Sequence, residues 1–476
     1  MPKTKPTYPD KAYVDGAWRS ADDELDVTDL AEGGAFTTIA AADASLADEA
    51  LSAAKGAEPA LRETTIVERT RWLAQIADSI EARTEELAEV IVREAGKPIA
   101  SARGEVESAV ERFRRAIEEA HSIDGEYIEG TTEGHEGWQG IVKPEPVGTV
   151  LCIGPYNYPL ATVTLQVAPA IAAGNSVIFK PASKTPVSGA ILAECIARSD
   201  MPAGAFNFVP GRGSVVGDVL AGDDRVNAIA MTGSSGAGQH VARTSGMVNL
   251  HMELGGNAPA LVFPDADLAT VTGACTAGSL KYAGQRCSAV SRVLAHESVH
   301  DELVERIDAE MDDWEQGDLF AESTAVGPLI DADQAEWVQE LVDDAVEKGA
   351  RLVRGGEADG VWFDPTLLAD VPHDARILTE EQFGPVAAVT TFESEEEAVE
   401  VANAGDLALD AAVFTSDYDR ALSLSERVDA GAVRINGAPS HGLGDFPFGG
   451  NKASGIGREG LGTTIGEFLR YKTVIL

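Results

Sequence analysis

GTVLCIGPYNYPLATVTLQVAPAIAAGNSVIFK, residues 148–180, is the stretch that decides the fold of this chain. Its apolar runs predict buried strands at 148–153 and 176–180, and the segment 162–173 between them predicts a helix. Parallel strands need a crossover connection, usually a helix, so the stretch predicts a βαβ unit. Sheets of this kind bind nucleotides at the carboxyl ends of their strands.

The alternation of strand and helix continues beyond this stretch. It predicts helices at 186–198 and 214–221 and strands at 205–209 and 227–231. A second alternation, between 258 and 434, predicts strands near 260–263, 292–294 and 387–389 and helices at 267–281, 299–311 and 333–348. The predicted fold class is therefore α/β, with two doubly wound parallel-sheet domains.

Two segments differ from both alternations. Residues 122–142 are rich in glycine and polar residues and predict two short strands that project from the main body. Residues 471–476 predict a terminal strand. Such strands are only marginally stable alone, so we expect them to form a small β oligomerisation element that docks on another subunit.

The chain is strongly acidic. Its 476 residues include 78 Asp plus Glu against 37 Lys plus Arg, a formal net charge of −41. This field repels nucleic acid and anionic lipid, so neither is an expected partner. The longest apolar run, 147–173, is broken by prolines, and the N-terminus lacks the apolar region of a secretory signal, so we expect a cytoplasmic protein. The acidity also predicts a halophilic surface, on which salt screens the self-repulsion.

The four cysteines are Cys152, Cys195, Cys275 and Cys287. They form no CxxC pair, and the histidines form no HExxH pair, so we expect neither disulfides nor a metal centre. Cys287 stands apart because it lies in YAGQRCSAVSR, residues 282–292. A neighbouring cation favours the nucleophilic thiolate, and Arg286 precedes it; the alternative for such a cysteine is a small buried hydrophobe.

Glycine-rich turns follow two of the predicted strands. Residues 211–217 and 233–238 each open a predicted helix, whose free N–H groups suit a pyrophosphate. Neither segment is a regular GxGxxG motif, and each is also compatible with a plain turn.

Seven ordered motifs together resemble the NAD(P)-dependent aldehyde dehydrogenase superfamily over essentially the full length. They are PYNYP (155–159), FKPA (179–182), TGS (232–234), ELGG (253–256), GQRC (284–287), EEQFGP (380–385) and PFGGNKASG (447–455). The chain is most similar to the branch of non-phosphorylating glyceraldehyde-3-phosphate and lactaldehyde dehydrogenases. The resemblance implies a dinucleotide-binding domain (1–121 and 143–253), a catalytic domain (254–445) and an oligomerisation element (122–142 and 458–476) in a homodimer or homotetramer.

The resemblance implies catalytic roles for Cys287, Asn157 and Glu253. Cys287 attacks the aldehyde as a thiolate, and the Asn157 amide and the Cys287 N–H hold the oxyanion of the thiohemiacetal; such donors are typically worth about 3–4 kcal/mol each. Hydride transfer leaves a thioester, which water activated by Glu253 hydrolyses. Acyl-transferring members lack this base. The alternatives are an acyl-transferring enzyme and a catalytically silent binding protein of the same fold.

The resemblance also implies a cofactor, NADP or NAD. It assigns the nucleotide contacts to Ile153, Lys180, Ser183, Gly213, Gly217, Gly233, Ser234, Glu381 and Phe383. NAD-preferring relatives often carry Glu at the position of Ser183, where its carboxylate would repel a 2′-phosphate. We therefore expect NADP to be favoured.

The substrate implied by the resemblance is a short anionic or hydroxylated aldehyde, such as glyceraldehyde 3-phosphate, lactaldehyde or a semialdehyde. We expect Tyr158, Arg286 and His441 to contact it, although Arg286 could instead bridge a structural carboxylate. The phosphate site of the branch uses further arginines. Where these are expected, this chain has Ser108 and the segment 440–442, which disfavours a doubly charged phosphate.

Overall fold

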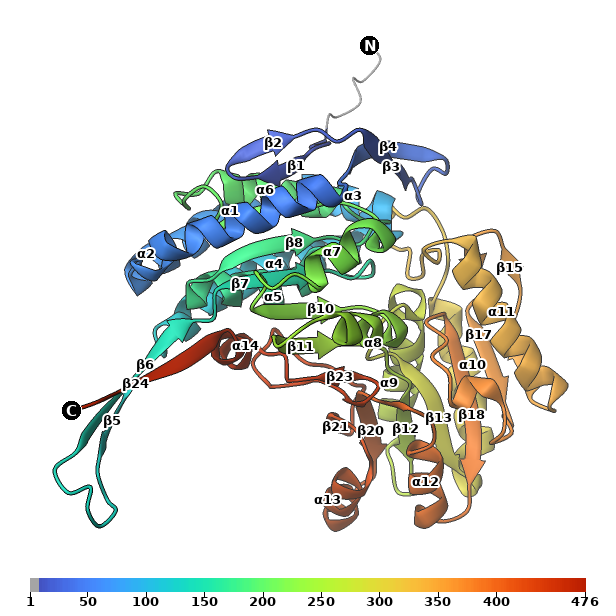
Figure 1. Cartoon of the computed structure of the whole chain (residues 1–476). Helices are drawn as coiled ribbons and strands as arrows, with labels where there is room; N and C mark the ends of the chain where they lie inside the picture. Colours follow the sequence, from blue (N-terminus) through green and yellow to red (C-terminus); the bar gives the residue numbers. More distant parts are fainter. Residues whose placement is uncertain (1–7) are drawn as a thin grey trace.

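The computed structural model describes residues 8–476, which form two α/β sheets and a projecting β arm (Figure 1). The strands of the first sheet are β1 (Ala12–Val14), β2 (Ala17–Arg19), β7 (Thr149–Ile153), β8 (Ser176–Lys180), β9 (Phe206–Phe208), β10 (Ala228–Thr232), β11 (Asn249–Glu253) and β23 (Gly455–Ile456). Their order is β2-β1-β9-β8-β7-β10-β11-β23, parallel from β9 to β11 and antiparallel at the edges. Because the strand order reverses between β7 and β10, the carboxyl ends there form a crevice suited to a ligand.

The second sheet confirms the second predicted alternation and adds strands to it. Its strands are β12 (Ala258–Val262), β13 (Val290–His296), β14 (Arg351–Arg354), β17 (Thr366–Ala369), β18 (Val386–Phe392), β20 (Asp410–Phe414) and β21 (Ala432–Ile435). Their order is β14-β17-β18-β13-β12-β20-β21, and only β14 is antiparallel to its neighbour. The helices of this half are α9 (Leu268–Leu280), α10 (Glu297–Glu310), α11 (Ala332–Glu347), α12 (Glu395–Ala402) and α13 (Tyr418–Arg427).

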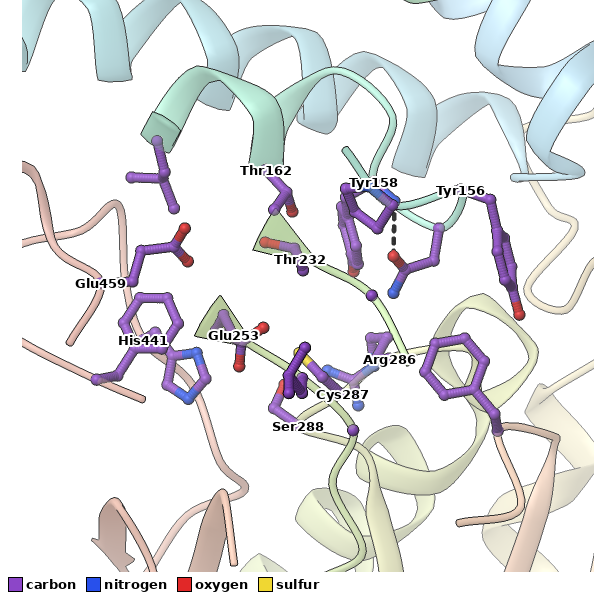
Figure 2. Close-up of a pocket in the computed structure, with 18 of the residues that line it drawn as sticks. Tyr156, Tyr158, Thr162, Thr232, Glu253, Arg286, Cys287, Ser288, His441 and Glu459 are labelled. Atoms are coloured by element: carbon purple, nitrogen blue, oxygen red, sulfur yellow. Dashed lines mark hydrogen bonds between the residues drawn. The ribbon is translucent and has the colours of Figure 1, made fainter. Parts of the chain in front are cut away.

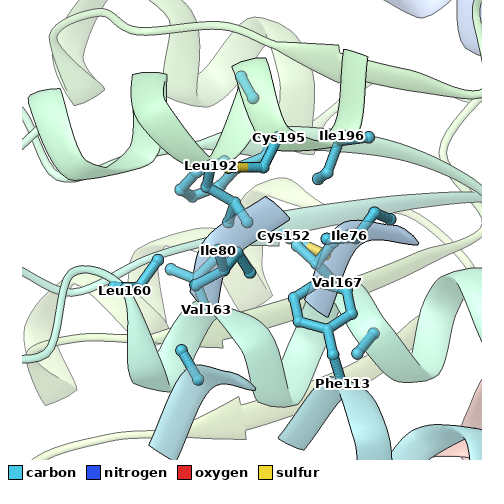
Figure 3. Packing of buried hydrophobic residues seen from close by; sticks show 14 of the residues in the cluster. Ile76, Ile80, Phe113, Cys152, Leu160, Val163, Val167, Leu192, Cys195 and Ile196 are labelled. Atoms are coloured by element: carbon cyan, nitrogen blue, oxygen red, sulfur yellow. The ribbon is translucent and has the colours of Figure 1, made fainter. Parts of the chain in front are cut away.

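Helices cover the first sheet and bury its apolar strands. They are α1 (Ala44–Arg62), α2 (Ile66–Glu81), α3 (Thr84–Ala95), α4 (Ile99–Ala120), α5 (Ala161–Ala173), α6 (Val187–Ala197), α7 (Asp218–Ala221), α8 (Ser235–Thr244) and α14 (Leu461–Glu467). Helix α5 is apolar on nearly every side because it lies between the strands and α2 and α4, and Phe113, Val163 and Val167 pack in this core (Figure 3). The helix expected at 214–221 is instead a π turn, Gly213–Gly217, followed by the short α7.

The arm consists of β5 (Glu126–Glu129), β6 (Gln139–Pro146) and β24 (Leu469–Ile475), and it projects from the main body (Figure 1). Strand β24 pairs with β6 of the same chain, from Leu469 opposite Pro146 to Ile475 opposite Gly140. Short pairs complete the structure: β3 (Asp23–Thr28) with β4 (Ala35–Ala41), β15 (Ala358–Asp359) with β16 (Trp362–Phe363), and β19 (Leu407–Ala408) with β22 (Asn451–Lys452). Within the described residues, no helix has the length and apolar character to cross a membrane.

Candidate active site

A cavity of about 510 Å³ lies at the carboxyl ends of the first sheet. Residues that follow β7, β10 and β11 line it, together with the loop before β13 and the C-terminal segments around 440 and 459. It brings together the predicted catalytic residues Cys287 and Glu253 (Figure 2), and Asn157 also lines it. Within residues 8–476, no group of His, Cys, Asp or Glu side chains is arranged to hold a metal ion.

A strained turn presents Cys287 to the cavity. After α9, Tyr282, Ala283 and Gly284 all have positive φ, of 55°, 50° and 68°. Residues with a side chain rarely adopt a positive φ. A Cβ on Gly284 would also lie 2.0 Å from the Gly384 carbonyl oxygen. The Tyr282 hydroxyl donates a hydrogen bond of 2.8 Å to the Ala95 carbonyl, which anchors the turn. The strain is thus held by packing, and it fixes the thiol at the cavity wall.

Asn157 and Glu253 reach the thiol from two strand ends of the first sheet. The Asn157 amide donates to the Gln285 carbonyl at 2.9 Å, and its oxygen accepts from the Tyr158 N–H at 3.1 Å. Glu253 is the last residue of β11 and is only 2% exposed, and its Oε1 has no hydrogen-bond partner within the described residues. Both side chains therefore line the cavity that holds the nucleophile, Glu253 from the end of a strand and Asn157 from the loop after β7.

Buried carboxylates, and not a cation, dominate the surroundings of Cys287. Burial raises the pKa of the thiol well above its usual value, and the charges of Glu253, Asp410, Glu381 and Glu459 raise it further. Burial and the charges of Glu459 and Asp410 likewise raise the pKa of Glu253. Burial and these carboxylates therefore disfavour the thiolate, and the expectation that Arg286 favours it stays a prediction.

We call Glu253, Asp410 and Glu459 the carboxylate cluster. Asp410 is 3% exposed and accepts hydrogen bonds of 2.8 and 2.7 Å from Nε2 of His441, whose ring stacks on Phe448 at 3.8 Å between centroids. His441 lines the cavity as predicted, but its pairing with Asp410 means that it is not a free cation. Glu459 is 2% exposed, and its carboxylate points toward the region of Glu253 (Figure 2).

We call Arg112, Lys281 and Arg286 the cationic cluster. All three line the cavity, and none forms an ion pair within residues 8–476. Nε of Arg112 and Nε of Arg286 are buried without hydrogen-bond partners in the described structure, and the terminal Nη2 of Arg286 donates to the Gly278 carbonyl at 2.6 Å. The alternative that Arg286 bridges a structural carboxylate is thus wrong.

Arg112 is one of the cavity residues that were not predicted from the sequence, with Lys281 and Glu459. It lies on α4, one helical turn after Ser108, so that both side chains face the cavity. Ser108 at the expected arginine position therefore does not exclude a cation here, because the side chain of Arg112 from the next helical turn covers the same surface. The helical spacing of four residues was the available signal.

A buried ion pair supports Tyr158, which lines the cavity as predicted. Lys97 pairs with Glu105, and its Nζ lies 3.4 Å from the centroid of the Tyr158 ring. The other oxygen of Glu105 accepts from the N–H groups of Leu160 and Ala161 at 3.0 and 3.1 Å, at the start of α5. The pair therefore fixes both the aromatic ring and the helix that follows Asn157 in the chain.

The predicted cofactor residues follow the strand ends. Gly233, Ser234, Glu381 and Phe383 line the cavity. Ile153 ends β7, Lys180 ends β8 opposite it, Ser183 follows β8, and Gly213 and Gly217 lie in the turn after β9.

These residues fit a dinucleotide. Burial lowers the pKa of Lys180 to about 8, and its Nζ donates only to the Pro181 carbonyl, which leaves donors for ribose hydroxyls. Ser234 caps α8, whose N-terminus opens beside the cavity and suits a pyrophosphate. Glu381 accepts from the Gly256 N–H at 2.9 Å, which fixes its carboxylate at the cavity wall.

The sequence and the fold are similar to those of known proteins. The sequence profile described as "Aldehyde dehydrogenase family" matches residues 18–474. The chain is 36% identical to the NADP-dependent glyceraldehyde-3-phosphate dehydrogenase of Streptococcus equinus, over 98% of each chain. It is 35% identical to the lactaldehyde dehydrogenase of Methanocaldococcus jannaschii, over 98% of this chain and 99% of that one. The crystal structure of the NADP-dependent glyceraldehyde-3-phosphate dehydrogenase of Bacillus halodurans complexed with NADP superposes with a TM-score of 0.97, at 34% identity and 99% coverage of both chains.

Proposed function

The chain belongs to the aldehyde dehydrogenase family, and we propose that it oxidises a small anionic aldehyde to the carboxylic acid with NADP. The observation that carries the proposal is the pairing of two clusters in one cavity. The thiol of Cys287 lies among buried carboxylates, and unpaired cations line the same space. In a chain with 78 acidic and 37 basic residues, cations without carboxylate partners suit an anionic ligand.

Cys287 is the proposed nucleophile. Glu253, which lines the same cavity, takes the proton of the thiol as the sulfur attacks the aldehyde carbon. The oxyanion of the resulting thiohemiacetal is held by the Asn157 amide and the Cys287 N–H, donors that are typically worth about 3–4 kcal/mol each. NADP, when bound, supplies the acceptor for the hydride that leaves this carbon.

Glu253 is also the proposed base for hydrolysis of the thioester. Its pKa is raised toward neutral pH, and a general base is most effective when its pKa lies near the working pH. Glu253 first loses the proton that it took from the thiol. A water that it then deprotonates attacks the acyl carbon, and Cys287 leaves as the thiolate. This base beside the thiol favours hydrolysis over acyl transfer to coenzyme A, and the intact set of Cys287, Asn157 and Glu253 disfavours a silent binding protein.

Arg112 and Arg286 are the proposed anchors of the substrate anion, with Tyr158 and His441 as further walls. Each guanidinium has a buried Nε without a partner in residues 8–476, and a bound phosphate or carboxylate would satisfy such donors. Arg112 supports glyceraldehyde 3-phosphate, which the sequence disfavoured, beside semialdehydes and the hydroxylated lactaldehyde. The relatives named above act on glyceraldehyde 3-phosphate and lactaldehyde.

The nucleotide is proposed to bind through Ile153, Lys180, Ser183, Gly213, Gly217, Gly233, Ser234, Glu381 and Phe383. NADP is favoured because Ser183 places no carboxylate beside the ribose, and its hydroxyl donates to the Gly211 carbonyl at 3.0 Å. Lys184, the next residue, contacts Asp331, so we do not assign it to the 2′-phosphate.

The arm is the proposed interface of a homodimer or homotetramer. Tyr127, Tyr471 and Ile475 are 58%, 62% and 61% exposed, and large apolar side chains gathered on a narrow β arm suit a second subunit. The proposed domains follow the boundaries predicted from the sequence, and the cytoplasmic location and the salt requirement stay predictions. Tm and activity that do not change between low and molar salt would contradict halophily.

The test is NADP and NAD reduction with glyceraldehyde 3-phosphate, succinic semialdehyde, lactaldehyde, glyceraldehyde and acetaldehyde, in low and molar salt. We expect the anionic aldehydes to exceed the neutral ones in kcat/KM by about tenfold or more, equal to about 1.4 kcal/mol. NADP should exceed NAD. Turnover that requires coenzyme A or phosphate, or no turnover with any aldehyde, would contradict the proposal.

A further inference from the structure

Aldehyde oxidation in a buried site releases protons that must reach solvent. An aldehyde, water and NADP⁺ become a carboxylate, NADPH and two protons, so Glu253 must be relieved of a proton in each turnover. Glu253 is 2% exposed and lies at the end of β11, the next-to-last strand of the first sheet. A buried base of this kind needs a route along which protons leave.

A series of unsatisfied buried atoms begins at Glu253. Oε1 of Glu253, Oε1 of Glu459 and Nε2 of His251 have no hydrogen-bond partner within residues 8–476. Buried polar groups are nearly always paired, so three in one neighbourhood indicate bound water or proton exchange. His251 and Glu253 are alternate residues of β11 and project from the same face of that strand.

His251 connects this neighbourhood to the surface. Its Nδ1 hydrogen-bonds to Oε2 of Glu467, the last residue of α14. The side chain of His251 is 4% exposed and that of Glu467 is 29% exposed. Oε1 of Glu467 accepts a hydrogen bond of 3.1 Å from the N–H of Arg458. Arg458 directly precedes Glu459 in the chain, so this bond fixes the Glu467 carboxylate to the segment that carries Glu459. Glu467 thus contacts both the buried imidazole and solvent.

We propose that Glu459, His251 and Glu467 form the proton exit path of Glu253, an inference that rests on the proposed hydrolytic function. An O–H bond of water breaks as its oxygen bonds to the acyl carbon and the Cys287 sulfur leaves, and Glu253 takes the proton. The proton passes to Glu459 and then to Nε2 of His251. The imidazolium releases its Nδ1 proton to Glu467, which loses it to solvent.

The charges around the path suit proton exchange. Burial raises the pKa of Glu459, while the charges of His251, Arg112 and His441 act to lower it and Glu467 acts to raise it. With the pKa of Glu253 raised as well, both carboxyls lie nearer the range of an imidazole than free Glu does. Burial lowers the pKa of His251, but the bond to Glu467 and the charges of Glu459 and Glu467 outweigh it, so the imidazole accepts a proton readily.

The test is stopped-flow formation of NADPH by His251→Gln with the best aldehyde of the panel. The burst should stay at wild-type rate and one equivalent per site, because hydride transfer precedes hydrolysis. The steady-state rate should fall by about tenfold, less than the typical loss on removing a general base itself, and its solvent deuterium isotope effect should rise. Glu467→Gln should act alike, and the double variant should be no slower than either single variant.

His300→Gln is the matched control. His300 is 3% exposed, its Nε2 has no hydrogen-bond partner within the described residues, and its Nδ1 lies 3.0 Å from the exposed Asp301. It lies on α10, away from the cavity lining, so this variant should keep both phases.

Two outcomes would overturn the exit path. One is a His251→Gln enzyme with the wild-type steady-state rate and isotope effect. The other is an equal loss of burst and steady state, which marks a structural role. If His251→Gln does not fold, Glu467→Gln alone decides between these outcomes, because its side chain is partly exposed and the amide keeps the shape of the carboxylate. Absence of NADPH formation by the wild type would instead contradict the proposed function.

Discussion

The carboxylate cluster and the cationic cluster line the same cavity but differ in whether the protein itself supplies partners for their charges. Asp410 is paired with His441, and burial raises the pKa values of Glu253 and Glu459. The cations Arg112, Lys281 and Arg286 form no ion pairs within residues 8–476. The carboxylates can therefore store and release protons without a ligand, whereas the guanidinium groups need one to satisfy their buried donors.

Arg112 is where the two clusters meet. Burial lowers its pKa, and the charges of Glu459 and Glu105 act in the opposite direction. The cavity thus combines a proton-handling part with an anion-binding part, and single substitutions should separate the two. The predictions below run from the largest expected effect to the smallest.

Replacing the nucleophile should have the largest effect. Cys287→Ser should lower kcat by roughly 10⁴- to 10⁶-fold, the scale of losing a covalent nucleophile, and should abolish the burst of NADPH. Binding of NADPH, measured by its fluorescence, should be unchanged. A variant that retains a burst would show that another group accepts the acyl moiety.

Removing the base should separate the two half-reactions. Glu253→Gln should lower steady-state kcat by about 10²- to 10⁴-fold. A carboxyl-free site should still form the thioester once the thiol is deprotonated by raising the pH, so a burst should persist at high pH. If burst and steady state vanish together at every pH, Glu253 serves thiol attack alone and hydrolysis needs another base.

Substitutions in the cationic cluster should lower kcat/KM for anionic substrates only. Arg112→Ala should lower kcat/KM for glyceraldehyde 3-phosphate or succinic semialdehyde by roughly 10- to 100-fold, since a hydrogen bond to a charged group is worth about 1.5–3 kcal/mol. Acetaldehyde should be affected by less than about twofold, well under 1.4 kcal/mol. Arg114→Ala, on the same helix but pairing with Glu81 at the surface, is the control and should change neither. Equal losses for charged and neutral aldehydes would make Arg112 structural.

The smallest expected effect is a shift in the pH dependence of the alkylation rate of Cys287. Because the pKa of Cys287 is raised, its alkylation by iodoacetamide in the free enzyme should accelerate with pH beyond the range of an ordinary thiol. Glu253→Gln removes a carboxylate charge, so the midpoint should move down, with about tenfold more thiolate below the midpoint for each pKa unit. A midpoint below that of a free cysteine would contradict the raised pKa and support the sequence-based role of Arg286.

Much of the fold follows from local patterns. The strands β7 and β8 are buried at every position, and each has a run of three or more consecutive apolar residues, so this signal survives without tertiary information. The second sheet was harder to predict, since β14 and β21 have four residues each, are partly exposed and contain arginines. The turn at Gly213–Gly217 was predicted as a helix because its composition does not distinguish a π turn from an α-helix.

The α/β class and the family could be predicted from the sequence alone, because they depend on residue types in a fixed order along the chain. The same order pointed to Cys287, Glu253 and Asn157 as residues of one site. Only the tertiary structure decided the electrostatics of the site. Arg286 is next to Cys287 in the chain, yet burial and carboxylates from distant segments raise the pKa of the thiol. Arg112, His251, Glu459 and Glu467 likewise gain their roles only through folding, because charge interactions depend on distance in space and on burial, and neither is encoded by adjacency.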